Sequence, residues 1–290
     1  MSLNKLSSSV VRETAVIAAV FLLFSGDLGA SRADDTSNWD KDLYSASRLV
    51  AGSARQQGDV PTLRAGIELT LQPGWKTYWR YPGDSGIPPR FDFAGSTNVR
   101  SATVAWPAPK RFEDGGGMSI GYENGVIFPV HVVARDPAKP VLLRMKIEYG
   151  VCRNLCVPAT GSGELALSAK PAALDAALAA AEARVPRLAA VGDNGPFAIR
   201  NVAREDAAPH PRVVVDVAAP PSVHVDLFAE GPTPDWALPL PSPVAQTNTG
   251  LRRFVFELDG LPPGTKPDGA VLTLTAVSEH EAIEVKTRLD

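Results

Sequence analysis

The stretch that decides the fold is residues 141–158, VLLRMKIEYGVCRNLCVP. From Val141 to Tyr149 apolar and polar residues alternate, which is the period of a half-buried β-strand. The far side opens with Val157-Pro158, and proline stops a helix from continuing. A helix could also bring residues i and i+4 together, but the flanks favour a β-hairpin with a three-residue tip. The sequence therefore predicts a hairpin with two cysteines facing each other across its end.

Those cysteines, Cys152 and Cys156, are the only two in the chain. A disulfide across such a small loop stabilises a protein by about 2 kcal/mol, against about 4.7 kcal/mol for a hundred-residue loop. Accessible disulfides of this kind tend to be the exchangeable ones. The pair is therefore our candidate catalytic site, acting by thiol–disulfide exchange, with one cysteine forming a mixed disulfide and the other resolving it.

Two other readings of the pair stay open at this point. The bridge can be a structural staple in a binding or scaffold module. Two thiolates also suit Cu(I), with His131 as a third ligand. The four histidines are scattered, however, and have no ligand spacing: His131, His210, His224 and His280. We expect no resident metal and no cofactor.

The remainder of the first half reads as short strands between turns rich in proline and glycine. Leu63–Leu71 alternates, with Leu63, Ile67 and Leu69 on one face and Arg64 and Glu68 on the other. Further runs follow at 102–106, 126–134 and 164–168. Several strands with no helix between them predict a β-sandwich over residues 34–170.

An alanine-rich segment then interrupts the strands. Residues 171–190 predict one helix of about 14 residues, with Pro171 in its first turn and Pro186 breaking its far end. We take residues 171–192 as a helical linker, or as a helix packed on either side. Strand patterns resume over residues 193–290 and predict a second sandwich without cysteine.

Residues 1–33 read as a secretory signal peptide. Lys5 and Arg12 precede an apolar run at 14–25, and Ser31-Arg32-Ala33 fits a cleavage site. The expected location is therefore the periplasm, an oxidising space where disulfides persist. The formal net charge of −3 without a basic stripe argues against nucleic acid as a partner.

Several motifs in order resemble the N-terminal periplasmic domain of the thiol:disulfide interchange protein DsbD, and ScsB-type reductases more closely. They are Gly121-Tyr122-Glu123-Asn124-Gly125, Tyr149-Gly150-Val151-Cys152, Cys156-Val157-Pro158-Ala159, Trp75-Lys76-Thr77-Tyr78-Trp79-Arg80, Pro82-Gly83-Asp84-Ser85-Gly86 and Trp106-Pro107-Ala108-Pro109. The resemblance covers residues 38–170, with a looser match beyond. It implies an immunoglobulin-like fold for the first domain. Together with the strand pattern beyond residue 192, the predicted fold is all-β, with two immunoglobulin-like sandwich domains joined by the short alanine-rich helix.

The resemblance also implies a role and partners. Family members shuttle reducing equivalents from a membrane-embedded protein, of the DsbD or CcdA kind, to periplasmic thioredoxin-like proteins. This chain is expected to do so as a stand-alone component of a protein-disulfide reductase system, because it lacks the family's membrane and thioredoxin-like domains. The family shields its disulfide with an aromatic loop residue. Glycines occupy that place here, which leaves Phe112 and Met118 as substitutes and Tyr122 and Tyr149 as further candidates for shielding or for the partner face.

Overall fold

The computed structural model describes residues 35–57, 60–83, 86–114, 117–207, 209–244 and 250–290. The predicted signal peptide lies outside these described residues. In the described part nearly all regular secondary structure is strand, with one short helix, so the all-β prediction is confirmed. It contains no helix that is long and apolar enough to cross a membrane.

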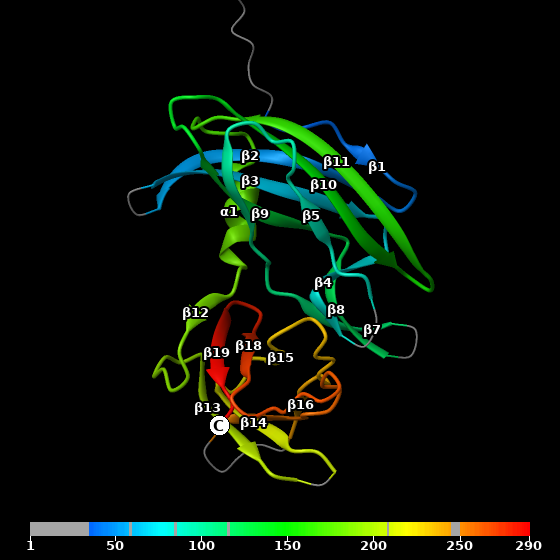
Figure 1. Cartoon of the computed structure of the whole chain (residues 1–290), viewed down its shortest axis with the longest axis vertical. Coiled ribbons are helices and arrows are strands. Elements are labelled where there is room, and N and C mark those ends of the chain that lie inside the picture. The colour runs from blue at the N-terminus through cyan, green and yellow to red at the C-terminus, as the bar shows by residue number, and fades with distance from the viewer. Residues whose placement is uncertain (1–34, 58–59, 84–85, 115–116, 208, 245–249) are drawn as a thin grey trace, which may run out of the picture. The chain divides into compact units, whose positions relative to one another are not determined.

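The first sandwich is formed by two sheets (Figure 1). One has the strand order β1-β2-β3-β9-β6, and the other has the order β11-β10-β4-β8-β7 with β5 beside β10. Its strands are β1 (Asp40–Lys41), β2 (Ser45–Gln57), β3 (Val60–Leu71), β4 (Lys76–Gly83), β5 (Arg90–Asp92), β6 (Val99–Val104), β7 (Lys110–Asp114), β8 (Gly117–Glu123), β9 (Gly125–Ala134), β10 (Val141–Cys152) and β11 (Cys156–Leu167). The alternating apolar side chains form one core between the sheets, including Ile67, Phe128, Leu143 and Ile147.

The second sandwich has two four-stranded sheets, with the orders β12-β19-β18-β15 and β13-β14-β17-β16. Its strands are β12 (Arg187–Ala189), β13 (Ala198–Glu205), β14 (Arg212–Ala218), β15 (Asp226–Glu230), β16 (Ser242–Pro243), β17 (Arg252–Glu257), β18 (Val271–Val277) and β19 (Ala282–Arg288). Val215, Leu227, Phe254 and Leu274 are among the side chains that fill its own core.

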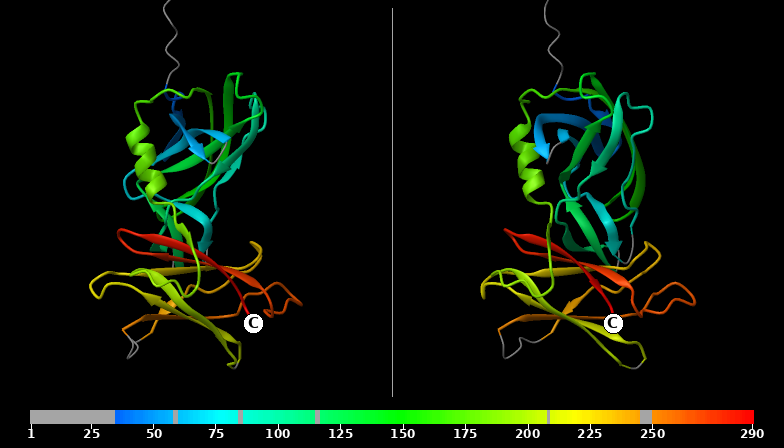
Figure 2. Two further views of the ribbon diagram at one scale, coloured as in Figure 1. Left: turned by 90° about the vertical axis from the view of Figure 1, so that its left-hand side faces the viewer. Right: turned by 60° about the vertical axis from the view of Figure 1, so that its left-hand side comes forward.

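The helix α1 comprises Asp175–Ala183, nine residues rather than the expected 14 or so. Pro171 lies four residues before the start of the helix, so its expected place in the first turn is wrong, and beyond Pro186 residues Arg187–Ala189 pair in parallel with β19. In both views of Figure 2 the helix runs alongside the first sandwich. Leu178 is fully buried, and its side chain lies over Gly52 and Gly66 of β2 and β3. The helix is therefore part of the first sandwich's packing.

Arg64 shows what the helix does to the sheet beneath it. The strand pattern places this side chain on the polar face of β3, yet only 3% of it is exposed because α1 covers it. Its Nε lies 2.7 Å from Glu182 Oε1 and its Nη1 lies 2.9 Å from Asp175 Oδ1. Both carboxylates come from α1, so the helix supplies the countercharges that a buried guanidinium requires.

Strands β4 and β7 also contact the second sandwich. The rings of Trp79 and Phe228 are 5.8 Å apart between centroids. The Tyr81 hydroxyl donates to the Leu238 carbonyl at 2.7 Å, and Arg111 Nη2 donates to the Leu227 carbonyl at 3.2 Å. Strand β4 thus pairs with β8 and β10 in its own sheet and also contacts the second sandwich.

Candidate functional site

The two cysteines face each other at the turn end of the β10–β11 hairpin. Strand β10 pairs with β11 over its full twelve residues, ending with Cys152 opposite Cys156. Their Cα atoms are 4.2 Å apart and their sulfurs form a disulfide. The tip, Arg153-Asn154-Leu155, is exposed, and Leu155 is 72% accessible. The hairpin predicted from the flanking pattern is confirmed.

The bridge is asymmetric in its exposure. Cys152 is completely buried, whereas Cys156 is exposed at the start of β11. This follows from the position of the two strands: β10 lies inside its sheet, and β11 is the edge strand. A thiol-bearing partner can therefore approach Cys156 and not Cys152, a distinction that the four-residue spacing did not reveal.

Strand β10 changes neighbours just before the disulfide. Lys146–Glu148 pair with β5, while Val151 and Cys152 pair with Thr77 and Lys76 of β4. Between these two pairings, the Gly150 N–H donates a hydrogen bond to the Ile87 carbonyl at 3.1 Å. These bonds fix the register that places β4 beside the sulfurs.

Tyr78 of β4 is the residue that this register brings to the disulfide. Its hydroxyl oxygen lies 2.6 Å from Cys152 Sγ and 3.0 Å from Cys156 Sγ. The residue is completely buried. Sequence reasoning did not select it. Alternation along β4 does place Tyr78 on the face opposite to the core residue Trp79, but the sequence gives no register for β4 against β10.

The four residues proposed for shielding or partner contact lie elsewhere in the same sandwich. Phe112 of β7 is 8% exposed, and its ring centre lies 4.4 Å from Lys76 Nζ. Met118 of β8 pairs with Glu113 in the β7–β8 hairpin. For Phe112 and Met118, shielding stays a prediction.

The two tyrosines among those candidates direct their hydroxyls away from the sulfurs. Tyr122 donates to the Pro107 carbonyl at 2.8 Å, and burial raises its pKa well above the usual value. Tyr149 shares a hydrogen bond of 2.7 Å with Ser45 Oγ, and burial raises its pKa too. Both rings belong to the first core cluster, so their part in a partner face also stays a prediction.

The structure separates His131 from the two cysteines. No group of three or more potential ligands occurs among the described residues. His131, the third ligand of the Cu(I) reading, lies on β9 in the opposite sheet, and its Nε2 is 4.0 Å from Glu182 Oε1.

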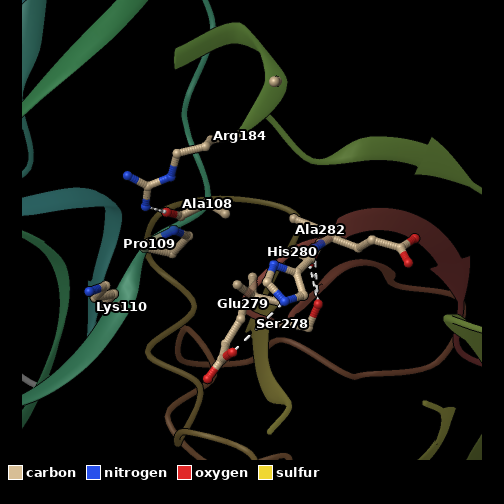
Figure 3. Close-up of a pocket in the computed structure, with 11 residues that line it drawn as sticks. Ala108, Pro109, Lys110, Arg184, Ser278, Glu279, His280 and Ala282 are labelled. Carbon is tan, nitrogen blue, oxygen red and sulfur yellow. Dashed lines mark hydrogen bonds and ion pairs between the residues drawn. The ribbon is translucent and has the colours of Figure 1, made fainter. Parts of the chain in front are cut away.

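A separate cavity of about 360 Å³ lies where α1 ends (Figure 3). Ala108, Lys110 and Arg184 line one side of it, and the turn from Ser278 to Ala282 lines the other. The Arg184 guanidinium donates to the Ala108 carbonyl at 3.3 Å. Neither cysteine lines this cavity, so it is distinct from the disulfide site.

The fold and the hairpin disulfide together define a class: an all-β domain with a sulfur pair at the end of an exposed hairpin. The family described as thiol:disulfide interchange protein DsbD, N-terminal, matches residues 43–167, which include both cysteines. Residues 43–167 are thus a DsbD N-terminal-like domain. The family and the disulfide within the matched segment indicate a thiol–disulfide exchange module.

The crystal structure of the N-terminal periplasmic domain of ScsB from Proteus mirabilis has the same fold. It superposes with a TM-score of 0.68 over 89% of this chain and 99% of that chain, at 19% identity. The likeness therefore extends beyond the segment matched by the family and agrees with an immunoglobulin-like architecture. A marsupial T cell receptor aligns over 87% of this chain and 99% of the receptor chain, with a TM-score of 0.18 and 10% identity. Comparison with the curated proteins gives no significant match.

Proposed function

We propose that this protein is a periplasmic thiol–disulfide exchange protein that passes reducing equivalents through Cys152 and Cys156. The observation that carries the proposal is the exposed end of the hairpin, where the accessible Cys156 is bonded to the buried Cys152. An accessible disulfide can be attacked by an external thiolate without unfolding of the strands that hold it.

The asymmetry in exposure supports a different role for each cysteine. Cys156 forms the mixed disulfide with the partner because its side chain is exposed. Cys152 then resolves that intermediate from its buried position across the hairpin. In the reducing direction, the Cys156 thiolate attacks a partner disulfide, Cys152 attacks Cys156 Sγ, and the partner leaves with both of its sulfurs reduced.

The partners in this proposal are of two kinds. A membrane-embedded protein of the DsbD or CcdA kind supplies electrons, and periplasmic thioredoxin-like proteins accept them. The chain then serves as one component of a protein-disulfide reductase system. The family match supports this assignment because the family is described as part of a thiol:disulfide interchange protein.

Equilibration with glutathione redox buffers tests whether the bond exchanges at all. We expect the folded protein to titrate at a potential less negative than about −300 mV, the range of exchangeable disulfides. A potential well below about −300 mV identifies a permanent staple, which is the scaffold reading, and overturns the proposal.

Trapping tests the assignment of roles. The reduced Cys152→Ser variant retains the exposed Cys156 and should accumulate a mixed disulfide with an oxidised thioredoxin-like protein. The matched Cys156→Ser variant, which retains the buried sulfur, should accumulate far less. Equal trapping by both variants contradicts the assignment, and trapping by neither contradicts the exchange function.

A further inference from the structure

The Tyr78 hydroxyl contacts both sulfurs. It donates a hydrogen bond to Cys152 Sγ at 2.6 Å and lies 3.0 Å from Cys156 Sγ. Cys152 is the sulfur that solvent does not reach. Any negative charge that forms on it is therefore cut off from water and depends on hydrogen bonds from the protein.

The ring of Tyr78 is held in a narrow slot between two glycines. A Cβ at Gly150 would lie 3.2 Å from Tyr78 Cε2, and a Cβ at Gly86 would lie 2.5 Å from Tyr78 Cδ1. The φ of Gly86 is +141°, a conformation that side chains disfavour in any case. Because the Gly150 N–H bonds the Ile87 carbonyl, the segment that covers the ring is tied to the strand beneath it.

We propose that Tyr78 is a catalytic residue that stabilises the Cys152 thiolate by donating a hydrogen bond to it. The inference rests on the exchange function proposed above. When an external thiolate attacks Cys156 Sγ, a new sulfur–sulfur bond forms there. The bond between Cys156 and Cys152 breaks, and its electron pair goes to Cys152 Sγ, which leaves as a thiolate.

The hydroxyl is already in place for that charge. It lies within hydrogen-bond distance of the leaving sulfur before the reaction begins, so no reorganisation is needed as the bond breaks. A hydrogen bond to an ionised sulfur is stronger than the one to the neutral disulfide. The contact therefore stabilises the product of the attack more than the starting bond, which accelerates exchange.

Tyr78→Phe tests this by removing the hydroxyl and keeping the ring. The matched control is Tyr81→Phe on the same strand, which loses a phenol hydrogen bond to the Leu238 carbonyl instead. The measurement is the second-order rate of disulfide reduction by dithiothreitol in the folded protein, as a function of pH. We expect Tyr78→Phe to react about 10- to 100-fold more slowly, as for the loss of a hydrogen bond to a charged group. Tyr81→Phe should stay within about twofold of the wild type.

A second measurement separates chemistry from packing. In a Cys156→Ser background, the pKa of the Cys152 thiol is read from its thiolate absorbance with and without Tyr78→Phe. We expect removal of the hydroxyl to raise that pKa by about one unit, a tenfold change in ionisation. A purely structural role for Tyr78 leaves this pKa where it was.

The outcomes distinguish the two proposals. If the folded wild type is not reduced by dithiothreitol, the exchange function itself fails. If the wild type is reduced and Tyr78→Phe matches Tyr81→Phe in rate and in the Cys152 pKa, the exchange function stands and the role of Tyr78 is overturned.

Discussion

Arg80 of β4 and Glu230 of β15 are joined by a two-pronged ion pair, with Nη2 2.6 Å from Oε1 and Nε 2.9 Å from Oε2. The same guanidinium reaches Glu284 of β19 at 2.6 Å. These three side chains are 25%, 17% and 15% exposed, respectively. Tyr78 lies two residues before Arg80 on the same strand. The ion pair therefore ties the strand that carries the sulfur-contacting hydroxyl to the second sandwich.

Replacement of Arg80 by Met should destabilise the protein. The variant leaves the carboxylates of Glu230 and Glu284 partly buried without the Arg80 charge. Removing one partner of such a pair destabilises a protein because the remaining charge is left uncompensated. We expect the free energy of unfolding in urea to fall by about 1–3 kcal/mol, below the range for fully buried pairs. Arg144→Met is the control, because the Arg144–Glu164 pair is 46% and 52% exposed. An exposed pair contributes about 1 kcal/mol or less, so equal losses from the two variants contradict the prediction.

Asp175 should make the docking of α1 depend on pH. Burial raises the pKa of this carboxyl group, but hydrogen bonds from the Ala172 and Ser53 backbone and the Ser53 hydroxyl, together with the Arg64 charge, lower it more. The net pKa is below the ordinary value. A lowered pKa contributes stability that is present above the unfolded pKa of about 4 and is lost as pH falls through the folded pKa.

Asp175→Asn should therefore be less stable than the wild type at neutral pH. The difference should shrink as pH falls below about 4 and through the lower pKa of the folded state, where the wild-type carboxyl becomes protonated as well. Urea unfolding at a series of pH values measures it. A difference that does not change between pH 7 and pH 3 would show that the charge of Asp175 is not what holds the helix.

Leu178 should hold α1 to the sheet by packing alone. Its side chain is fully buried over Gly52 and Gly66, and its methyl groups occupy space that a Cβ at either glycine would need. Leu178→Ala should lower the free energy of unfolding by about 2–4 kcal/mol, as for other buried leucines. Ala177→Ser on the exposed side of the same helix should change it by less than about 1 kcal/mol. Similar effects from both would mean that α1 is not docked through Leu178.

Removal of the disulfide should leave the fold intact. The double variant Cys152→Ser, Cys156→Ser opens a ring of five residues, so we expect a loss of about 2 kcal/mol in urea unfolding. The β10–β11 pairing continues back to Val141 and Leu167 and does not depend on the bridge. Amide hydrogen exchange along β10 should stay slow in the variant. Loss of protection along the whole strand contradicts the prediction.

Much of the fold could be predicted from local pattern. The hairpin was predicted because alternation over Val141–Tyr149 and the proline at 158 leave one arrangement in which the cysteines meet. Strand β3 was predicted in the same way, since its core face repeats every second residue. These features depend on residues that are close in sequence, and the alternation of apolar and polar residues indicates them directly.

What could not be predicted depends on contacts between distant segments. Arg64 reads as a solvent-facing strand residue, and only the docked helix makes it buried. Residues 187–189 lie in the predicted linker beyond the proline that ends its helix, and their parallel pairing with β19 has no signal in the local sequence. The place of Tyr78 beside the sulfurs depends on two pairs between β4 and β10, and no local pattern encodes a register between residues more than 70 positions apart in the chain.

The pairing of β10 with β11 has a consequence for how long a partner stays attached. It holds the Cα atoms of Cys152 and Cys156 4.2 Å apart. The ladder that fixes this spacing persists when the sulfurs separate. Well-oriented groups within one molecule can react as if at about 10⁵ M or more. In the proposed exchange, a mixed disulfide at Cys156 would therefore be attacked by Cys152 far sooner than by thiols in solution, and the partner would be set free rather than accumulate as a dead-end adduct.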